Sequence, residues 1–227
     1  MADLGESAAY FDTVYFGWQG DSAERSARAV VPLILARLHP DSVVDVGSGT
    51  GGWLKVFREH GVADVMGVDG PYVEQAALRI EPHEFVGRDL NEPFELGRQF
   101  DLAISLEAAH YVPEARAPAL VESIAALAPA VLFGAAVPHQ PCGPGRNAQW
   151  PAWWAALFAE HGFRAEDWLR TRVWDDPRVD WWYAQNTILY LRDDRESEPV
   201  LPLVHPGLLE EVARRPDPPP RRGLFRR

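Results

Sequence analysis

The sequence predicts an α/β fold built on a mostly parallel sheet, with helices on both faces and an antiparallel strand at its C-terminal end. Short apolar segments alternate with segments of helical periodicity along most of the chain, a pattern typical of a parallel sheet covered by helices. One apolar segment runs directly into a glycine-rich turn that precedes a helix. Two late apolar segments are close enough in sequence to pair as antiparallel neighbours.

The first expected helix follows an aromatic N-terminal segment. Asp21 with Glu24 three positions later is a typical helix start, and apolar residues at helical spacing continue to position 38. Pro32 lies inside this pattern, so we expect it to kink or split the helix.

A strand, a glycine turn and a helix follow in direct succession. Residues 42–46 form a short apolar strand, residues 47–52 read Gly-Ser-Gly-Thr-Gly-Gly, and residues 53–60 form a helix that ends at Gly61. The middle of the chain continues this alternation. The elements expected there are strands at 64–68, 84–86, 100–106 and 130–136, and helices at 73–80 and 114–127.

The C-terminal third begins with a Pro/Gly-rich segment, residues 138–147, which predicts a loop over the carboxyl edge of the sheet. We expect a helix at 153–161, then paired strands at 165–173 and 186–191. Beyond Asp193 the pattern dissolves. We therefore predict one domain over residues 1–210 and a Pro/Arg-rich tail over residues 211–227.

Composition excludes several classes of protein. The formal net charge of −11 at pH 7 has the wrong sign for a partner with a polyphosphate backbone, so we expect no nucleic acid partner. Cys142 is the single cysteine, which excludes an intrachain disulfide and is compatible with a reducing cytoplasm. Neither a signal peptide nor a membrane span is recognisable, so we predict a cytoplasmic protein with no membrane partner. The histidines show no metal-ligand spacing, and we predict no catalytic metal.

The glycine turn narrows the choice of ligand. No Lys-Ser/Thr pair follows the glycines, which excludes a nucleoside-triphosphate loop. Asp69, at the end of the next strand, lies 24 positions after Asp45, where a carboxylate binds the ribose hydroxyls of either NAD or S-adenosylmethionine. Asp45 immediately precedes the glycines, where it would lie near a pyrophosphate. It suits the ammonium group of a methionine moiety better.

These residues resemble the class I S-adenosylmethionine-dependent methyltransferases. The matching motifs are residues 43–51 (VVDVGSGTG), 68–70 (VDG), 88–90 (RDL) and 100–107 (FDLAISLE). The resemblance covers about residues 25–192 and implies a Rossmann-like sheet of seven strands with S-adenosylmethionine as cofactor. The cofactor-binding residues that it implies are Asp45, Gly47, Ser48, Gly49, Asp69, Gly70, Asp89, Leu90, Leu106 and Glu107.

The sequence is also similar to a bacterial subgroup of small methyltransferase-domain proteins, from which it departs at the active face. That subgroup continues the fourth motif as Glu-x-Ala-Glu-His-Leu-Pro, whereas this chain has His110 and Tyr111 in place of Glu and His. Ala148 replaces a further acidic residue. The chemistry of the subgroup's acids therefore does not carry over to this chain.

The catalytic candidates are His110 and Tyr111, which follow the strand that ends beside the cofactor. Histidine titrates near neutral pH, so His110 is a candidate general base, with a helix-capping histidine as the equally weighted structural alternative. The substrate-binding candidates are polar loop residues and aromatic residues of the N-terminal cover and the loop: Tyr10, Tyr15, Asn147, Gln149 and Trp150. Asn147 and Gln149 have the alternative role of satisfying loop backbone groups.

Three functions remain open at this point. The first is methyl transfer from S-adenosylmethionine to a small-molecule acceptor, in secondary metabolism. The second is cyclisation of S-adenosylmethionine itself to azetidine-2-carboxylate with release of methylthioadenosine, for which aromatic faces and a base are needed. The third is a non-catalytic cofactor-binding scaffold, against which the intact glycines and Asp69 count. The sequence gives no indication of the oligomeric state.

Overall fold

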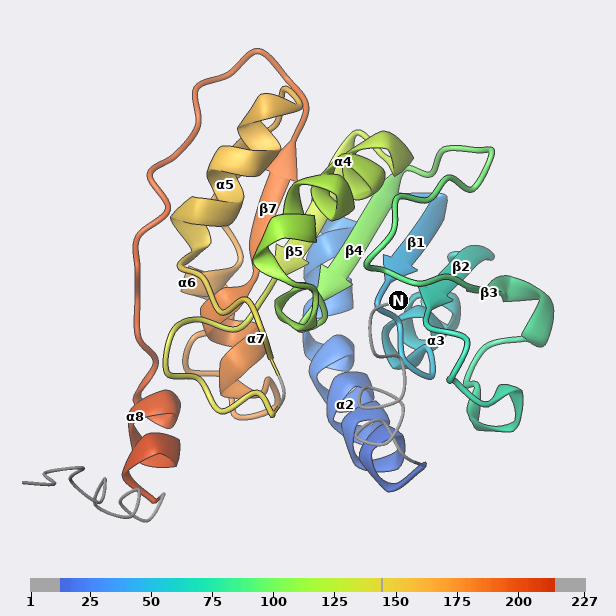
Figure 1. Cartoon of the computed structure of the whole chain (residues 1–227), viewed down its shortest axis with the longest axis horizontal. Coiled ribbons are helices and arrows are strands. Elements are labelled where there is room, and N and C mark those ends of the chain that lie inside the picture. The colour runs from blue at the N-terminus through green and yellow to red at the C-terminus, as the bar shows by residue number, and fades with distance from the viewer. Residues whose placement is uncertain (1–12, 144, 215–227) are drawn as a thin grey trace, which may run out of the picture.

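The computed structural model describes residues 13–143 and 145–214, and the side chains only from residue 20 onward. Seven strands form one sheet in the order β3-β2-β1-β4-β5-β7-β6 (Figure 1). The strands are β1 (Ser42–Val46), β2 (Asp64–Asp69), β3 (Phe85–Gly87), β4 (Leu102–Leu106), β5 (Ala130–Gly134), β6 (Arg164–Glu166) and β7 (Ile188–Leu191).

Strand direction confirms the predicted α/β sheet. The pairs β1/β2, β1/β4, β2/β3 and β4/β5 are parallel, whereas β7 lies antiparallel to both β5 and β6. The arrowhead of β7 accordingly points opposite to those of β4 and β5 in Figure 1. The chain passes from β1 outward to β2 and β3 and then returns to β4 on the other side of β1. Ligands of open α/β sheets bind at such a reversal, outside the carboxyl ends of the strands.

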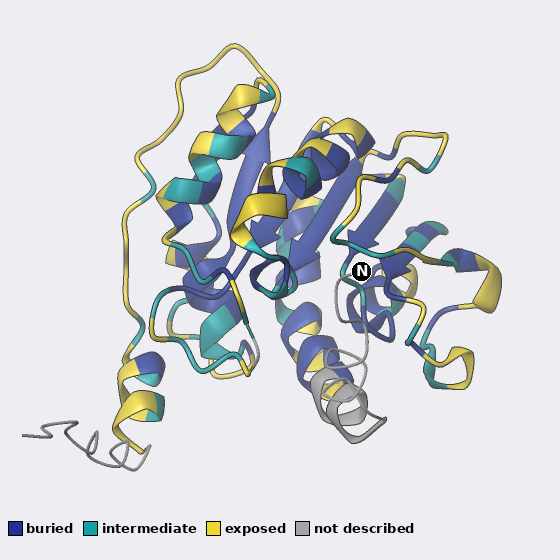
Figure 2. Ribbon diagram, in the orientation of Figure 1, coloured by how far each residue is buried: buried dark blue, intermediate teal, exposed yellow. Residues whose placement is uncertain are grey.

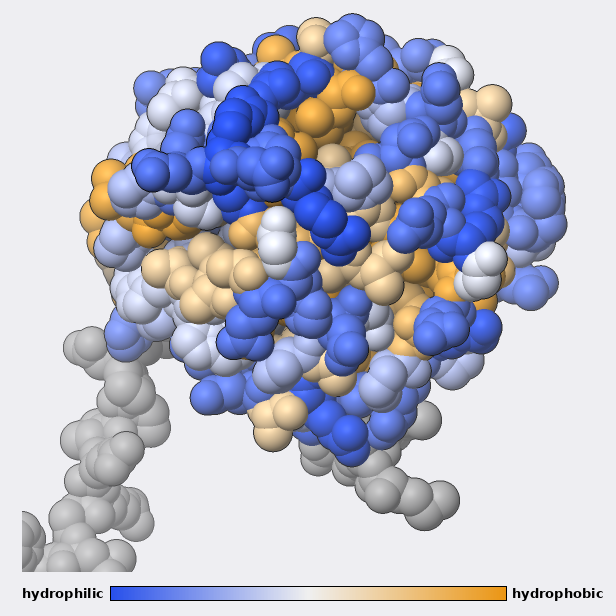
Figure 3. All heavy atoms as spheres, turned by 90° about the horizontal axis from the view of Figure 1, so that it is seen from above, coloured by the Kyte–Doolittle hydropathy of each residue, from blue (hydrophilic) through white to orange (hydrophobic). Residues whose placement is uncertain are grey.

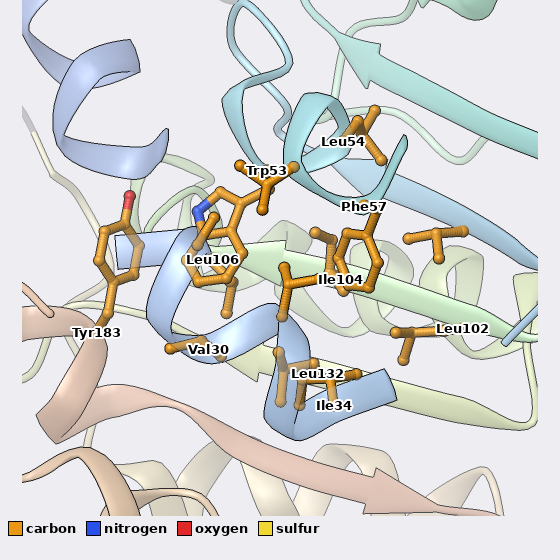
Figure 4. Close-up of a cluster of buried hydrophobic side chains, with 14 of the residues drawn as sticks. Val30, Ile34, Trp53, Leu54, Phe57, Leu102, Ile104, Leu106, Leu132 and Tyr183 are labelled. Carbon is orange, nitrogen blue, oxygen red and sulfur yellow. The ribbon is translucent and has the colours of Figure 1, made fainter. Parts of the chain in front are cut away.

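Helices cover the sheet on both sides and bury it (Figure 2). The helices are α2 (Thr13–Leu38), α3 (Gly52–Glu59), α4 (Ala117–Leu127), α5 (Pro151–Glu160), α6 (Arg170–Val173), α7 (Trp181–Asn186) and α8 (Pro206–Ala213). One apolar cluster joins the sheet to α2, α3, α6 and α7, and the other joins it to α4 and α5. In the first cluster, shown in Figure 4, Trp53 of α3 meets Tyr183 of α7 edge to face, with ring centroids 5.2 Å apart.

The first helix differs from the expectation. It begins at Thr13, and Asp21 lies inside it, where its carboxylate pairs with Arg79 instead of capping a helix start. The helix is not split at Pro32 but continues to Leu38. Val31 and Ile34, on either side of the proline, are fully buried, so packing against the sheet holds the helix together.

The helix predicted at 73–80 is wrong. Within this segment the structure has only a 3-10 turn, Gln75–Ala77. Ile80 packs against the glycine turn so closely that a Cβ on Gly51 would lie 3.1 Å from its Cγ1. The Arg79 N–H also donates to the Thr50 carbonyl over 2.8 Å. The end of this segment is therefore fixed by contact with the glycine turn and not by a helix.

The strand predicted at 165–173 is correct only at its start. β6 ends at Glu166, and α6 occupies Arg170–Val173. Arg170 is buried, pairs with Asp167 and donates to the Leu201 carbonyl over 3.0 Å. These contacts of the buried Arg170 guanidinium accompany the turn that the chain makes after Glu166.

Two C-terminal helices, α7 and α8, were not expected from the sequence. α7 replaces the beginning of the strand predicted at 186–191, which starts at Ile188. α8 contains the predicted boundary between residues 210 and 211, and residues 215–227 lie outside the described part of the chain. The division into a domain and a tail stays a prediction.

The segment between β7 and α8 runs along the outer edge of β6. The Glu198 N–H donates to the Ala165 carbonyl, and the Ala165 N–H donates to Ser197 Oγ, both over 2.9 Å. Backbone groups on the outer edge of β6, the outermost strand of the sheet, are thereby paired. The face of the molecule in Figure 3 is mostly hydrophilic with separate apolar patches. Among the described residues, no helix is long and apolar enough to cross a membrane.

Candidate functional site

The glycine turn after β1 lies against the ends of two other strands. The N–H groups of Gly47 and Ser48 both donate to the Val68 carbonyl of β2, over 2.7 and 3.2 Å. Gly47 has a φ of 84°, and a Cβ there would lie 2.1 Å from the Cβ of Ala108, just after β4. Only glycine fits this approach, which joins the ends of β1, β2 and β4 in one site.

Asp69, at the end of β2, holds the turn from the other side. Its carboxylate accepts hydrogen bonds from the N–H groups of Gly49 (2.7 Å) and Gly70 (2.6 Å) and from the Tyr72 hydroxyl (2.9 Å). Burial raises the pKa of Asp69, although these three donors act in the opposite direction. The predicted ribose-binding carboxylate is thus fixed beside Gly49 and Gly70.

Asp45 is a buried acid, and no donor among the described residues reaches its carboxylate. Only 2% of the residue is exposed, and burial together with the nearby Asp69 carboxylate raises its pKa well above the usual value. A buried carboxylate without a donor is costly to fold. A bound ammonium group would supply both the positive charge and the donors, so the site fits the methionine end of S-adenosylmethionine.

The segment after β3 brings two more of the predicted cofactor-binding residues, Asp89 and Leu90, to the same site. The Arg88 N–H donates to the Asp69 carbonyl over 2.8 Å, and the Leu90 side chain would lie 3.8 Å from a Cβ on Gly47. Asp89 Oδ1 accepts from the backbone (3.0 Å) and side chain (2.7 Å) of Asn91. This local turn orients the Asp89 carboxylate.

Glu107 follows β4 directly, whereas its neighbour Leu106 is buried in the core. The two oxygens of the Glu107 carboxylate accept from Asn186 Nδ2 (2.7 Å) and Gln140 Nε2 (2.8 Å). Burial raises the pKa of Glu107 to about 7, against the effect of these two donors. The sequence singled out neither Asn186 nor Gln140.

His110 has a geometry that differs from that of a general base. The Ala136 N–H donates to its Nδ1 over 3.1 Å, so Nδ1 is occupied and the proton of the neutral ring is assigned to Nε2. Burial lowers the pKa of His110 to about 3, and the buried Nε2 has no hydrogen-bond partner among the described residues. This ring is a hydrogen-bond donor at neutral pH. The Tyr111 ring lies against it, with centroids 4.2 Å apart.

The loop after β5 closes onto His110. The backbone N–H groups of Arg146 and Asn147 donate to the His110 carbonyl over 2.8 and 3.0 Å. Both side-chain polar atoms of Asn147 are buried with no hydrogen-bond partner in the described part of the chain, whereas Gln149 Nε2 donates to Glu114 over 3.3 Å. Trp150 is exposed and precedes α5. The remaining predicted substrate contacts, Tyr10 and the Tyr15 side chain, lie outside the described residues.

Comparison with known families places the chain. The family model of a methyltransferase domain matches residues 20–175, which is more than half of the sequence. The chain belongs to this methyltransferase family. Its sheet and glycine turn make it a class I S-adenosylmethionine-dependent methyltransferase. No curated protein matches the sequence.

Solved structures of methyltransferases share the fold. An O-methyltransferase family protein from Burkholderia thailandensis superposes with a TM-score of 0.59 at 21% identity, covering 88% of this chain and 65% of that one. An amino pentose methyltransferase from Micromonospora echinaspora, with bound S-adenosylmethionine, has a TM-score of 0.58 at 16% identity and coverages of 80% and 97%. This chain therefore spans just under two thirds of the first protein and most of the second.

The methyltransferase identity agrees with the residues that the turn brings together. Asp45, Asp69 and the backbone of residues 47–51 lie at the carboxyl ends of β1 and β2, the edge at which open α/β sheets bind ligands. Glu107 and His110 follow β4 at the same edge. Within the described residues, no group of three or more His, Cys, Asp or Glu side chains is placed to hold a metal ion.

Proposed function

We propose that this methyltransferase acts on a small-molecule acceptor in secondary metabolism, in the cytoplasm. The observation that carries the proposal is the contact of Arg146 and Asn147 with the His110 carbonyl, beside which the polar side-chain atoms of Asn147 are buried. A loop held over the strand ends favours an enclosed site over an open groove for a polymer. The amino pentose methyltransferase of similar fold, which is involved in calicheamicin biosynthesis, is consistent with this class of acceptor.

In this proposal, one group of residues binds the cofactor and another orients the acceptor. Asp69 and Asp45 would hold the ribose and ammonium ends of the cofactor, and the glycine turn would leave room for the methionine moiety. When bound, S-adenosylmethionine supplies a methyl group on a positively charged sulfur. Asn147 and the Nε2–H of His110 are uncharged polar groups that would orient the acceptor. Positioning and exclusion of water supply much of the acceleration in such a transfer.

The test is incubation of the purified full chain with S-adenosylmethionine alone and with a panel of amino sugars, sugar alcohols and phenols, followed by mass analysis. We expect intact cofactor without an acceptor, and S-adenosylhomocysteine with a methylated product in at least one mixture. A short DNA duplex and a denatured protein serve as polymer controls. Methylation confined to these polymers would contradict the proposal.

The same experiment decides the cyclisation alternative. None of the comparisons supports it, and the pKa of His110, lowered by burial to about 3, disfavours this ring as the base that cyclisation requires. Methylthioadenosine that accumulates well above the spontaneous background without any acceptor would establish cyclisation instead of methyl transfer.

A further inference from the structure

The Glu107 carboxylate is held by amide groups from two separate parts of the chain. Asn186 Nδ2, at the end of α7, donates to Oε1, and Gln140 Nε2, in the loop after β5, donates to Oε2. The same Asn186 group also donates to Gln140 Oε1 over 2.9 Å. The two amides therefore fix each other as well as the carboxylate.

The groups that face Glu107 carry no positive charge. Among the described residues, no Arg or Lys pairs with it. Asp45, on the neighbouring strand β1, interacts with Asp69 instead, and His110 is neutral with its Nδ1 occupied. Amide donors orient a carboxylate but do not supply the full opposing charge that would keep it ionised. Burial accordingly raises the pKa of Glu107 to about 7, where the group exchanges protons at neutral pH.

The backbone at Glu107 gives independent evidence of a functional position. Its φ of 58° lies in the left-handed region, which is unfavourable for a residue with a Cβ. Such strain persists where the surroundings impose it, and it is concentrated at active sites. Here the Glu107 N–H donates to the Gly134 carbonyl over 2.8 Å, and the next residue, Ala108, packs against Gly47. The side chain is half-buried at the edge of the sheet where the cofactor-binding turn lies.

We propose that Glu107 accepts the proton that the methyl acceptor loses, and that the acceptor group is therefore a hydroxyl or an ammonium. This inference rests on the proposed function. The bond between the acceptor atom and hydrogen breaks, and the proton passes to a Glu107 oxygen. The lone pair left on the acceptor atom forms the bond to the methyl carbon, and the electron pair of the carbon–sulfur bond stays on sulfur. The base is thus Glu107 in place of His110.

Gln140 and Asn186 act as positioning residues for this base. Gln185 Nε2 donates to Asn186 Oδ1 over 2.9 Å, which turns the Asn186 Nδ2 group toward Glu107. The His205 N–H in turn donates to Gln185 Oε1 over 2.7 Å. The orientation of the Glu107 carboxylate is thereby tied to the segment that leads into α8.

The first test needs neither cofactor nor acceptor. Infrared spectra of the full chain between about pH 5 and pH 9 follow the band of protonated carboxyl groups. We expect a component with a midpoint near 7 in the wild type that is absent from Glu107→Gln. Glu166→Gln is the matched control and should retain it, because Glu166 is held by Arg164 and Arg37. A difference spectrum between the wild type and Glu107→Gln that lacks a component near 7 would overturn the proposal, whereas a component common to both proteins comes from other carboxyl groups.

The second test uses whichever acceptor the mass screen identifies. Glu107→Gln should lower kcat by a factor of about 10²–10⁴ and abolish its rise with pH, as expected for loss of a general base. Its affinity for S-adenosylhomocysteine should stay within about threefold of the wild type. A proportional loss of that affinity would instead make Glu107 a cofactor-binding residue and overturn the proposal. Absence of methyl transfer in the wild type would contradict the proposed function. In that case the infrared measurement alone tests whether Glu107 exchanges a proton near pH 7.

Gln140→Met tests the positioning role. Removing one donor destabilises the ionised carboxylate, so the infrared midpoint should rise by about one pH unit. We expect kcat to fall at pH 7 with little change in KM, and the loss to shrink at higher pH. An unchanged midpoint would show that Gln140 does not position Glu107.

Discussion

Two regions of this molecule bury acidic side chains and treat their charges in opposite ways. On the flanks of the sheet, each buried glutamate lies against basic side chains: Glu24 against Arg28, Lys55 and Arg79, Glu84 against Arg58, and Glu166 against Arg37 and Arg164. At the carboxyl edge, Asp45, Asp69 and Glu107 have no basic partner among the described residues.

The pKa values separate the two regions. Burial raises the pKa of Glu24 and of Glu166, but the hydrogen bonds from their basic neighbours outweigh it, and both values lie below normal. Burial raises the pKa of Asp45, Asp69 and Glu107, and there the net values lie above normal. On the flanks, basic side chains of the same chain therefore balance the charge of the buried glutamates. At the carboxyl edge, the described part of the chain supplies no basic partner, a cost in stability that is typical of functional sites.

The largest expected effect is at the carboxyl edge. Asp69→Ala removes charge-assisted hydrogen bonds to the ribose and also frees the Gly49 N–H. We expect the affinity for S-adenosylhomocysteine to fall about a hundredfold, or roughly 3 kcal/mol, measured by calorimetry. Tyr72→Phe, which removes one neighbouring donor and keeps the carboxylate, should lose far less. If the affinity of Asp69→Ala for S-adenosylhomocysteine stayed within threefold of the wild type, Asp69 would not be the ribose-binding residue.

The next effect tests the flank. Arg164 is 5% exposed and pairs with Glu166 (2.9 Å) and Asp193 (2.5 Å). Arg164→Leu leaves the buried Glu166 with a single basic partner, Arg37, so we expect the free energy of unfolding in urea to fall by about 2–3 kcal/mol. Arg214→Ala removes an exposed ion pair with Glu210 and should change it by less than about 0.5 kcal/mol. Equal effects from the two variants would remove the distinction between buried and exposed pairs.

The smallest effect has the opposite sign. The pKa of Asp45 is raised in the folded state, so the folded chain binds more protons than the unfolded chain, and the ionised carboxylate lowers stability as pH rises. Asp45→Asn should therefore raise Tm at pH 8 by about 2–4 °C, the shift that about 1 kcal/mol produces in a chain of this size. The gain should shrink as the pH falls toward the ordinary pKa of aspartate.

Thermal unfolding at pH 8 and at pH 5 measures this difference, with Glu166→Gln as the paired-acid control. Glu166→Gln should lower Tm instead, because its carboxylate has two basic partners. Cofactor affinity of Asp45→Asn should fall while its stability rises. A lower Tm at pH 8 for Asp45→Asn would show that this carboxylate is stabilised within the chain.

The sequence predicted the parts of the site that depend on local signals. The glycines after β1 and the acids at the ends of β1 and β2 are recognisable because a strand, a tight turn and a helix N-terminus follow one another directly. The partners of Glu107 are different. Asn186 lies 79 positions away in sequence and Gln140 lies 33 positions away, and neither belongs to a recognisable motif.

The protonation state of His110 could not be predicted from the sequence either. Its place after β4 suggested a base, yet its protonation depends on the Ala136 N–H, a contact made only when β4 and β5 pair. The segment predicted as a helix at 73–80 is instead held by contacts of Arg79 and Ile80 with the glycine turn, which periodicity alone does not reveal. Local patterns thus predict the elements, and tertiary contacts determine the electrostatics.

The order of strands in the sheet also constrains how the chain can be completed during synthesis. β6 precedes β7 in sequence, but it joins the sheet only through β7, which lies between it and β5. Until residues 188–191 have been made, β5 therefore presents an open edge, and the nascent chain carries an unpaired β6. The segment that follows β7 then runs along β6. The open edge of β5 is thus closed only after β6 and α6 have been made.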